Sequence, residues 1–101
     1  MAAAAHLNCD STRFEIPSRL SSHHARELRL GVRRALEHGE RRLVVDCGAW
    51  EEFDFMMLSS LIQCAAACRE HGATFEVTSL SSDLKADVRE LRLHDRLDIR
   101  E

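Results

Sequence analysis

A short unbroken apolar run at residues 43–45 is the feature that most constrains how this chain can fold. Leu43, Val44 and Val45 lie between two arginines and Asp46, and Cys47 and a glycine follow. A brief β-branched and aliphatic run bounded by charge and glycine is typical of a strand buried on both faces, as in a parallel sheet. We therefore expect residues 41–47 to form the central strand of an α/β sheet.

Two further segments alternate between apolar and polar residues. Residues 12–16 place Phe14 and Ile16 on one face, and residues 73–78 do the same with Phe75 and Val77. This period of two predicts two more strands. Residues 3–9 are a weaker strand candidate, which would pair with residues 12–16 through a turn at residues 10–11.

Helical periodicity fills the intervals between these strands. Residues 21–38 and 55–71 carry apolar residues at three- and four-residue steps, and each segment is followed by a glycine suited to a C-terminal cap. Asp54 is the expected N-cap of the second helix. A third helix follows residues 81–83 and turns Leu84, Val88 and Leu91 inward. Strand and helix thus alternate, which implies parallel neighbours joined by helical crossovers.

Composition limits the function classes. The 101 residues suit one domain, residues 1–101, and the net charge of −3 comes without a basic stripe, so we expect no nucleic-acid partner. We also expect neither an export signal nor a membrane-inserted segment, because no apolar stretch is long enough. Cys9, Cys47, Cys64 and Cys68 lie in regular-looking segments, which favours reduced thiols and a cytoplasmic location.

The segment RLVVDCGAWEEFD at residues 42–54 joins a buried strand ending in Asp, a short loop and a second Asp that opens a helix. Together with the helix ending at residues 68–73, the strand at residues 75–77 and the tail at residues 91–99, it resembles the STAS domain family of anti-sigma-factor antagonists. The resemblance covers the chain from about Phe14 onward. It implies a small mixed sheet of four or five strands with helices mainly on one side, and a bacterial regulatory module without catalysis or cofactor.

One departure from the family pattern bears on function. Antagonists of this kind typically read Asp-Ser-Ser-Gly-Leu where this chain reads Asp54-Phe55-Met56-Met57-Leu58. The first serine of that pattern is the one that partner kinases phosphorylate, so the resemblance implies that the usual switch is absent here. Ser59 and Ser60 are poor replacements, because they lie a turn into the helix, where the amides are already bonded.

Two interpretations of the apolar helix start remain open. In the first, Phe55, Met56 and Met57 pack as core against Trp50 and Phe53. In the second, they form an exposed anchor, since three consecutive helical residues span about 300° and cannot all face one core. The second interpretation predicts a partner-binding site whose members are Trp50, Phe53, Asp54, Phe55, Met56 and Met57.

The expected function is docking to a cytoplasmic protein. The partner would be an anti-sigma-factor kinase or, alternatively, the ATPase of a lipid-transport ABC complex, on which STAS-like subunits also occur. A third alternative is a metal- or ligand-binding sensor using Cys64, Cys68 and His71, with Cys47 as a fourth ligand. Asp46 and Asp54 are expected to fix a loop and cap a helix, and His23, His24 and His38 to be exposed or capping residues.

Overall fold

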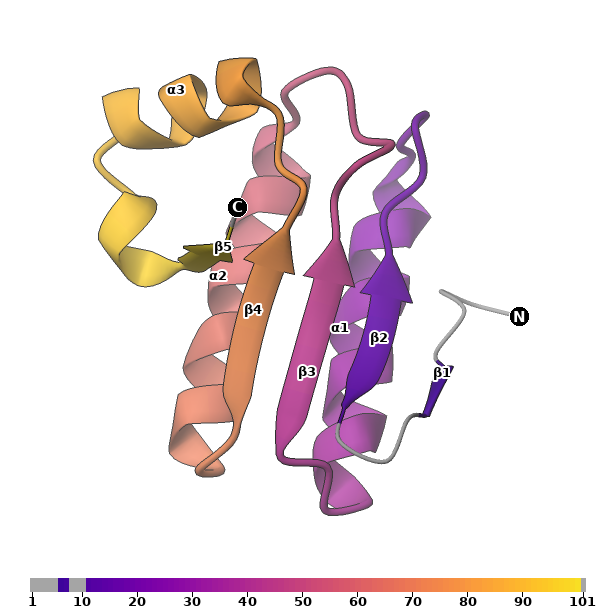
Figure 1. The fold of residues 1–101 in the computed structure, drawn as a ribbon. Helices are drawn as coiled ribbons and strands as arrows, with labels where there is room; N and C mark the ends of the chain where they lie inside the picture. Colours follow the sequence, from indigo (N-terminus) through magenta and orange to yellow (C-terminus); the bar gives the residue numbers. More distant parts are fainter. Residues whose placement is uncertain (1–5, 8–10, 101) are drawn as a thin grey trace.

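The computed structural model describes residues 6–7 and 11–100, which form five strands, three α-helices and one 3-10 helix (Figure 1). The elements, in chain order, are β1 (His6–Leu7), β2 (Thr12–Glu15), α1 (Ser22–Glu37), β3 (Arg42–Asp46), α2 (Phe55–Glu70), β4 (Thr74–Thr78), α3 (Ser82–Glu90), η1 (His94–Arg96) and β5 (Asp98–Arg100).

The strands form a single mixed sheet in the order β1-β2-β3-β4-β5. Strand β1 runs antiparallel to β2, and the other neighbours are parallel. The predicted α/β class and the central position of β3 are confirmed. Of the weaker strand candidate at residues 3–9, His6–Leu7 is a strand paired with β2, and residues 3–5 and 8–9 lie outside the described residues.

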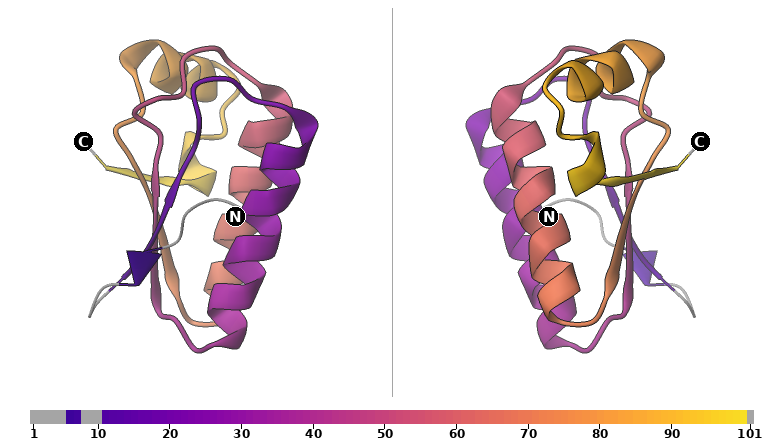
Figure 2. Two further views of the ribbon diagram at one scale, coloured as in Figure 1. Left: turned by 90° about the vertical axis from the view of Figure 1, so that its right-hand side faces the viewer. Right: turned by 90° about the vertical axis from the view of Figure 1, so that its left-hand side faces the viewer.

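Helices α1 and α2 pack side by side on one face of the sheet (Figure 2). Strands β2, β3 and β4 follow one another in space, and right-handed crossovers that advance in one direction leave their helices on the same side. Helix α3 lies beyond the carboxyl end of β4 (Figure 1). No described helix covers the other face of the sheet.

The core lies between the sheet and the two packed helices. Phe14, Ile16, Phe75 and Val77 are buried, as their alternation predicts. So are the apolar positions expected from the first helical pattern, Ala25, Leu28, Val32, Ala35 and Leu36. The fold is therefore held by one hydrophobic cluster that reaches from β2 to the tail after α3.

The prediction that β3 is buried on both faces is wrong at its two ends. Leu43 and Val45 are fully buried, but Arg42 is exposed and Asp46 is half-buried, because no helix covers that face. Val44 on the same face is nevertheless buried, and its register partners are Arg13 and Glu76. Long charged side chains can cover an apolar neighbour with their stems while their heads remain in water.

Ion pairs connect the strands across this uncovered face. Arg13 Nη2 on β2 lies 3.0 Å from Asp46 Oδ2 on β3, and Arg42 Nε lies 3.2 Å from Glu76 Oε2 on β4. Such exposed pairs contribute little to stability. They do make the uncovered face of the sheet polar.

The helix ends follow the sequence signals, with one exception. Gly39 and Gly72 after α1 and α2 adopt φ of +84° and +71°, the left-handed conformation that favours glycine. Leu84 and Val88 of α3 are buried as predicted, but Leu91 is 44% exposed. That prediction is wrong because α3 ends at Glu90, and Leu91 is already its C-cap. Among the described helices, none is long and apolar enough to span a membrane.

Candidate functional site

The loop between β3 and α2 is held by its own polar atoms. The backbone N–H of Gly48 donates to Asp46 Oδ1 at 2.9 Å, which folds the chain back as it leaves the strand. Trp50 is buried, and its indole N–H donates to the carbonyl of Glu52 at 2.7 Å. A buried ring with a satisfied N–H anchors a loop firmly, so residues 48–53 present the start of α2 in a defined position.

Helix α2 begins at Phe55 because Asp54 caps it. Asp54 has an extended backbone, and its Oδ1 accepts from the backbone N–H of Met57 at 2.9 Å. This is the N-cap role expected from the sequence. Asp46 likewise serves the loop and pairs with Arg13, so both carboxylates are engaged in structural bonds.

The first turn of α2 divides its apolar residues between solvent and core. Phe55 and Met56 are each 59% exposed, whereas Met57 and Leu58 are buried. Phe53, just before the cap, is 39% exposed. Phe53, Phe55 and Met56 together are called the α2-start surface below. Apolar side chains this exposed at consecutive positions are uncommon outside binding sites.

The prediction that three consecutive bulky residues cannot all turn inward is confirmed, and the structure shows which one does. Met57 lies three to four residues before Ser60 and Leu61, both buried, and so shares the inward stripe of α2. That spacing was the signal available in the sequence. Trp50 and Met57, both included in the predicted partner site, belong to the core and support the surface from beneath.

A groove that sequence reasoning missed lies beside the α2-start surface. It has a volume of about 490 Å³ and lies where the loop after β2 meets the loop after β3. Parallel topology brings both loops to the same edge of the sheet, and this was the signal that would have predicted it. Its lining is mostly polar and comprises Ser18, Arg19, Leu20, Glu51, Glu52, Phe53 and Asp54.

The two serines of α2 differ in their surroundings. Ser60 is buried, and its Oγ accepts from Arg29 Nη1 at 2.5 Å, which ties α1 to α2. Ser59 is partly exposed and its Oγ accepts from Gln63 at 3.4 Å. Ser60 therefore belongs to the packing between the helices, and neither serine lies at the helix start.

Among the described residues, Cys47, Cys64 and Cys68 do not converge with His71 into a metal site. Cys47, Cys64 and Cys68 are buried and free, and Cys9 lies outside the described residues. Burial raises the pKa of the Cys47 and Cys64 thiols to about 12 and that of Cys68 to about 11. Thiolate is the form that binds metal, so burial works against this set. The Nδ1 atom of His71 instead bonds the carbonyl of Ala67 at 2.9 Å.

The sheet order, the two helices on one face and the capped helix start beside the central strand have the layout of a STAS domain. The family model described as "Mlab, STAS domain" matches residues 4–101, so the chain belongs to that family. No curated protein matches the chain in sequence.

Solved structures share the fold at low sequence identity. The NMR structure of the protein TM1081 has a TM-score of 0.87 at 14% identity, covering 100% of this chain and 82% of that one. RsbS from Moorella thermoacetica has a TM-score of 0.84 at 17% identity, with coverages of 97% and 85%. An anti-sigma-factor antagonist (STAS) domain protein from Planctomyces limnophilus has a TM-score of 0.79 at 13% identity, with coverages of 98% and 89%.

Proposed function

We propose that this chain is a non-catalytic protein-interaction module, similar to the anti-sigma-factor antagonists, that docks a partner through the α2-start surface. The observation that carries the proposal is the 59% exposure of both Phe55 and Met56 on a helix whose next two residues are buried. Aromatic residues and methionine are enriched at the centres of protein interfaces. A capped turn that holds these two side chains in solvent is better suited to binding a partner than to catalysis.

The groove beside this surface supports a partner with a basic rim. Glu51, Glu52 and Asp54 line it on one side, and Arg19 is the cation among its lining residues. One oxygen of Asp54 is committed to its helix cap, which leaves Glu51 and Glu52 as the main source of negative charge. Complementary charge at an interface rim speeds association and selects partners more than it adds affinity.

The chemistry of the first turn favours a constant interaction surface over a phosphorylation switch. Phe55 occupies the first helical position, where a phosphate would meet the orphan amides of the helix start, but a phenyl ring has no hydroxyl to modify. Ser60 is buried in the contact with α1, and Ser59 lies within the helix. We propose that docking here is not switched by phosphate on this turn.

The second candidate is an accessory subunit of a lipid-transport ABC complex, bound to its cytoplasmic ATPase. The same observation at Phe55 favours it, because a subunit of a lasting assembly needs an apolar contact and no switch. Both candidates use the α2-start surface and place the chain in the bacterial cytoplasm. They differ in the partner, which is an anti-sigma-factor kinase in the first and an ATPase in the second.

Quantitative co-purification from the native host tests the proposal. We expect one protein to be recovered with the tagged chain and lost with the double variant Phe55→Glu, Met56→Glu. Leu91→Glu is the matched control, because Leu91 is also exposed but lies at the end of α3. A kinase or an ATPase among the lost proteins decides between the candidates. Recovery of the same partner by the double variant would place the docking surface elsewhere.

A further inference from the structure

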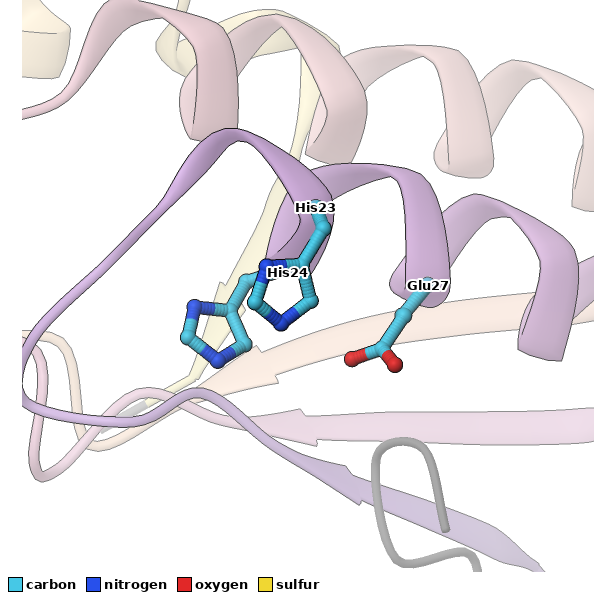
Figure 3. A group of neighbouring side chains, drawn as sticks. All are labelled: His23, His24 and Glu27. Carbon is cyan, nitrogen blue, oxygen red and sulfur yellow. The ribbon is translucent and has the colours of Figure 1, made fainter.

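A second site lies at the start of α1, away from the α2-start surface. His23, His24 and Glu27 each offer one donor atom, and these atoms lie within 4.8 Å of one another. Among the part of the chain that the structure describes, no other group of three histidine, cysteine or carboxylate side chains converges in this way. Figure 3 shows both rings and the carboxylate on the same side of the helix.

Helical spacing explains why the three side chains meet. Glu27 follows His23 by four residues and His24 by three, and both separations bring side chains onto one helix face. The two rings lie with their centroids 4.4 Å apart. Two imidazoles and one carboxylate form a donor set that zinc accepts when water completes its coordination.

The side chain of Ser21, the N-cap of α1, contacts the Nδ1 atom of each of the two histidine rings. Its Oγ lies 2.6 Å from His23 Nδ1 and 3.3 Å from His24 Nδ1. A hydroxyl oxygen has two lone pairs and can accept an N–H from each ring. Histidines that bind a metal through Nε2 usually donate the other ring N–H to an oxygen of this kind. If both rings donate from Nδ1 to Ser21 Oγ in this way, Nε2 of each ring is the metal donor.

Metal binding requires one proton to change place. In the structure the backbone N–H of Ser21 donates to His24 Nδ1 at 3.0 Å, so the neutral ring carries its proton on Nε2. When Nε2 binds a metal, the ring proton moves to Nδ1, which donates it to Ser21 Oγ. The exposed backbone N–H of Ser21 then donates to solvent water in place of His24 Nδ1. The exchange costs one exposed hydrogen bond and leaves the ring neutral.

A small cavity lies next to these ligands. Its volume is about 30 Å³, and its lining includes His24, Glu27 and the further carboxylate of Glu15. A space of this size accommodates a single water molecule. The cavity therefore offers room for one water beside the carboxylates of Glu15 and Glu27. The negative charge of Glu27 also offsets the unfavourable field that a helix start exerts on a cation.

We propose that Ser21, His23, His24 and Glu27 form a site for a divalent metal ion of the zinc class, with Glu27, His23 and His24 as ligands and Ser21 as their support. This site is independent of the docking surface on α2. The sequence predicts His23 and His24 only as exposed or capping residues, and the STAS fold by itself does not predict a metal site here.

Calorimetric titration of the full chain with zinc chloride tests this site. We expect one equivalent to bind, and His23→Ala or Glu27→Gln to weaken binding at least tenfold. His38→Ala is the matched control, since His38 is an exposed histidine at the other end of the same helix, and it should leave affinity unchanged. The metal-free thermal midpoint of Glu27→Gln should match that of the unaltered chain, which separates ligand loss from unfolding.

Cobalt(II) absorption identifies the ligands independently. Coordination by imidazole and carboxylate lacks the intense near-ultraviolet charge-transfer band that thiolate ligands give, so we expect that band to be absent. Its presence would assign the metal to the cysteines and overturn the proposal. Zinc binding that His23→Ala and Glu27→Gln both leave intact, or no binding at all, would overturn it equally.

Discussion

Truncating Phe55 tests whether it is a docking residue or a core residue, because the two roles predict different losses in the free energy of unfolding. Phe55 is 59% exposed, so about two-fifths of its surface is hidden. For a ring of roughly 200 Å² this amounts to ~80 Å², or at most about 2 kcal/mol at ~25 cal/mol per Å². Part of that area belongs to the backbone and Cβ, which alanine keeps, and alanine is the better helix former. We expect Phe55→Ala to lower the free energy of unfolding by less than ~1 kcal/mol.

The same change should be costly to docking. Loss of a desolvated aromatic anchor typically costs more than ~2 kcal/mol of binding, which weakens affinity more than about tenfold. The assays are urea unfolding of the free chain and titration of the purified partner once co-purification has identified it. Met57→Ala is the contrasting variant: Met57 is buried, so its truncation should cost about 2–5 kcal/mol of stability. A large loss of stability in Phe55→Ala with unaltered affinity per folded molecule would refute the reasoning and make Phe55 a core residue.

Two further predictions concern stability. Asp54→Ala removes the bond to the Met57 amide and should lower the free energy of unfolding by about 1 kcal/mol, whereas Asp54→Ser should retain most of it; an unchanged urea midpoint in the alanine variant would contradict the capping role. Burial raises the pKa of Cys47, Cys64 and Cys68, so above about pH 9 the unfolded chain loses thiol protons that the folded chain keeps, and stability should fall as pH rises further. Urea unfolding at pH 8 and pH 10 measures this fall, and a free energy independent of pH would contradict it.

The strand and helix order was accessible from the sequence because each element carries its own period. Phe14 and Ile16 alternate with polar residues, and the apolar stripe on α1 repeats at helical steps. Asp54 is a residue type typical of the N-cap and so predicts the start of α2. Strand β5 was not located because three residues, Asp98–Arg100, are too few to show a period. Its position depends on pairing with β4, which is a tertiary contact.

The candidate sites were only partly accessible from the sequence. A helix of regular pitch guarantees that some of Phe55, Met56 and Met57 face solvent, and the structure was needed to show that Met57 is the buried one. The metal site expected at Cys64, Cys68 and His71 rested on helical spacing alone, which does not say which face of a helix is exposed. Cys64 and Cys68 share a helix face that points into the core.

The stiffness of the support beneath the α2-start surface bears on how docking would gain its free energy. Asp54 fixes the first turn and Trp50 anchors the preceding loop, so Phe55 and Met56 are held by bonded neighbours before any partner arrives. Ordering flexible segments is one of the main costs of association, and a surface already in place avoids most of it. Affinity would then depend chiefly on the two exposed apolar side chains. Weakening the cap should therefore reduce affinity through a loss of order in the first turn, whereas truncating Phe55 should reduce affinity by removing the contact itself, with only a small loss of stability.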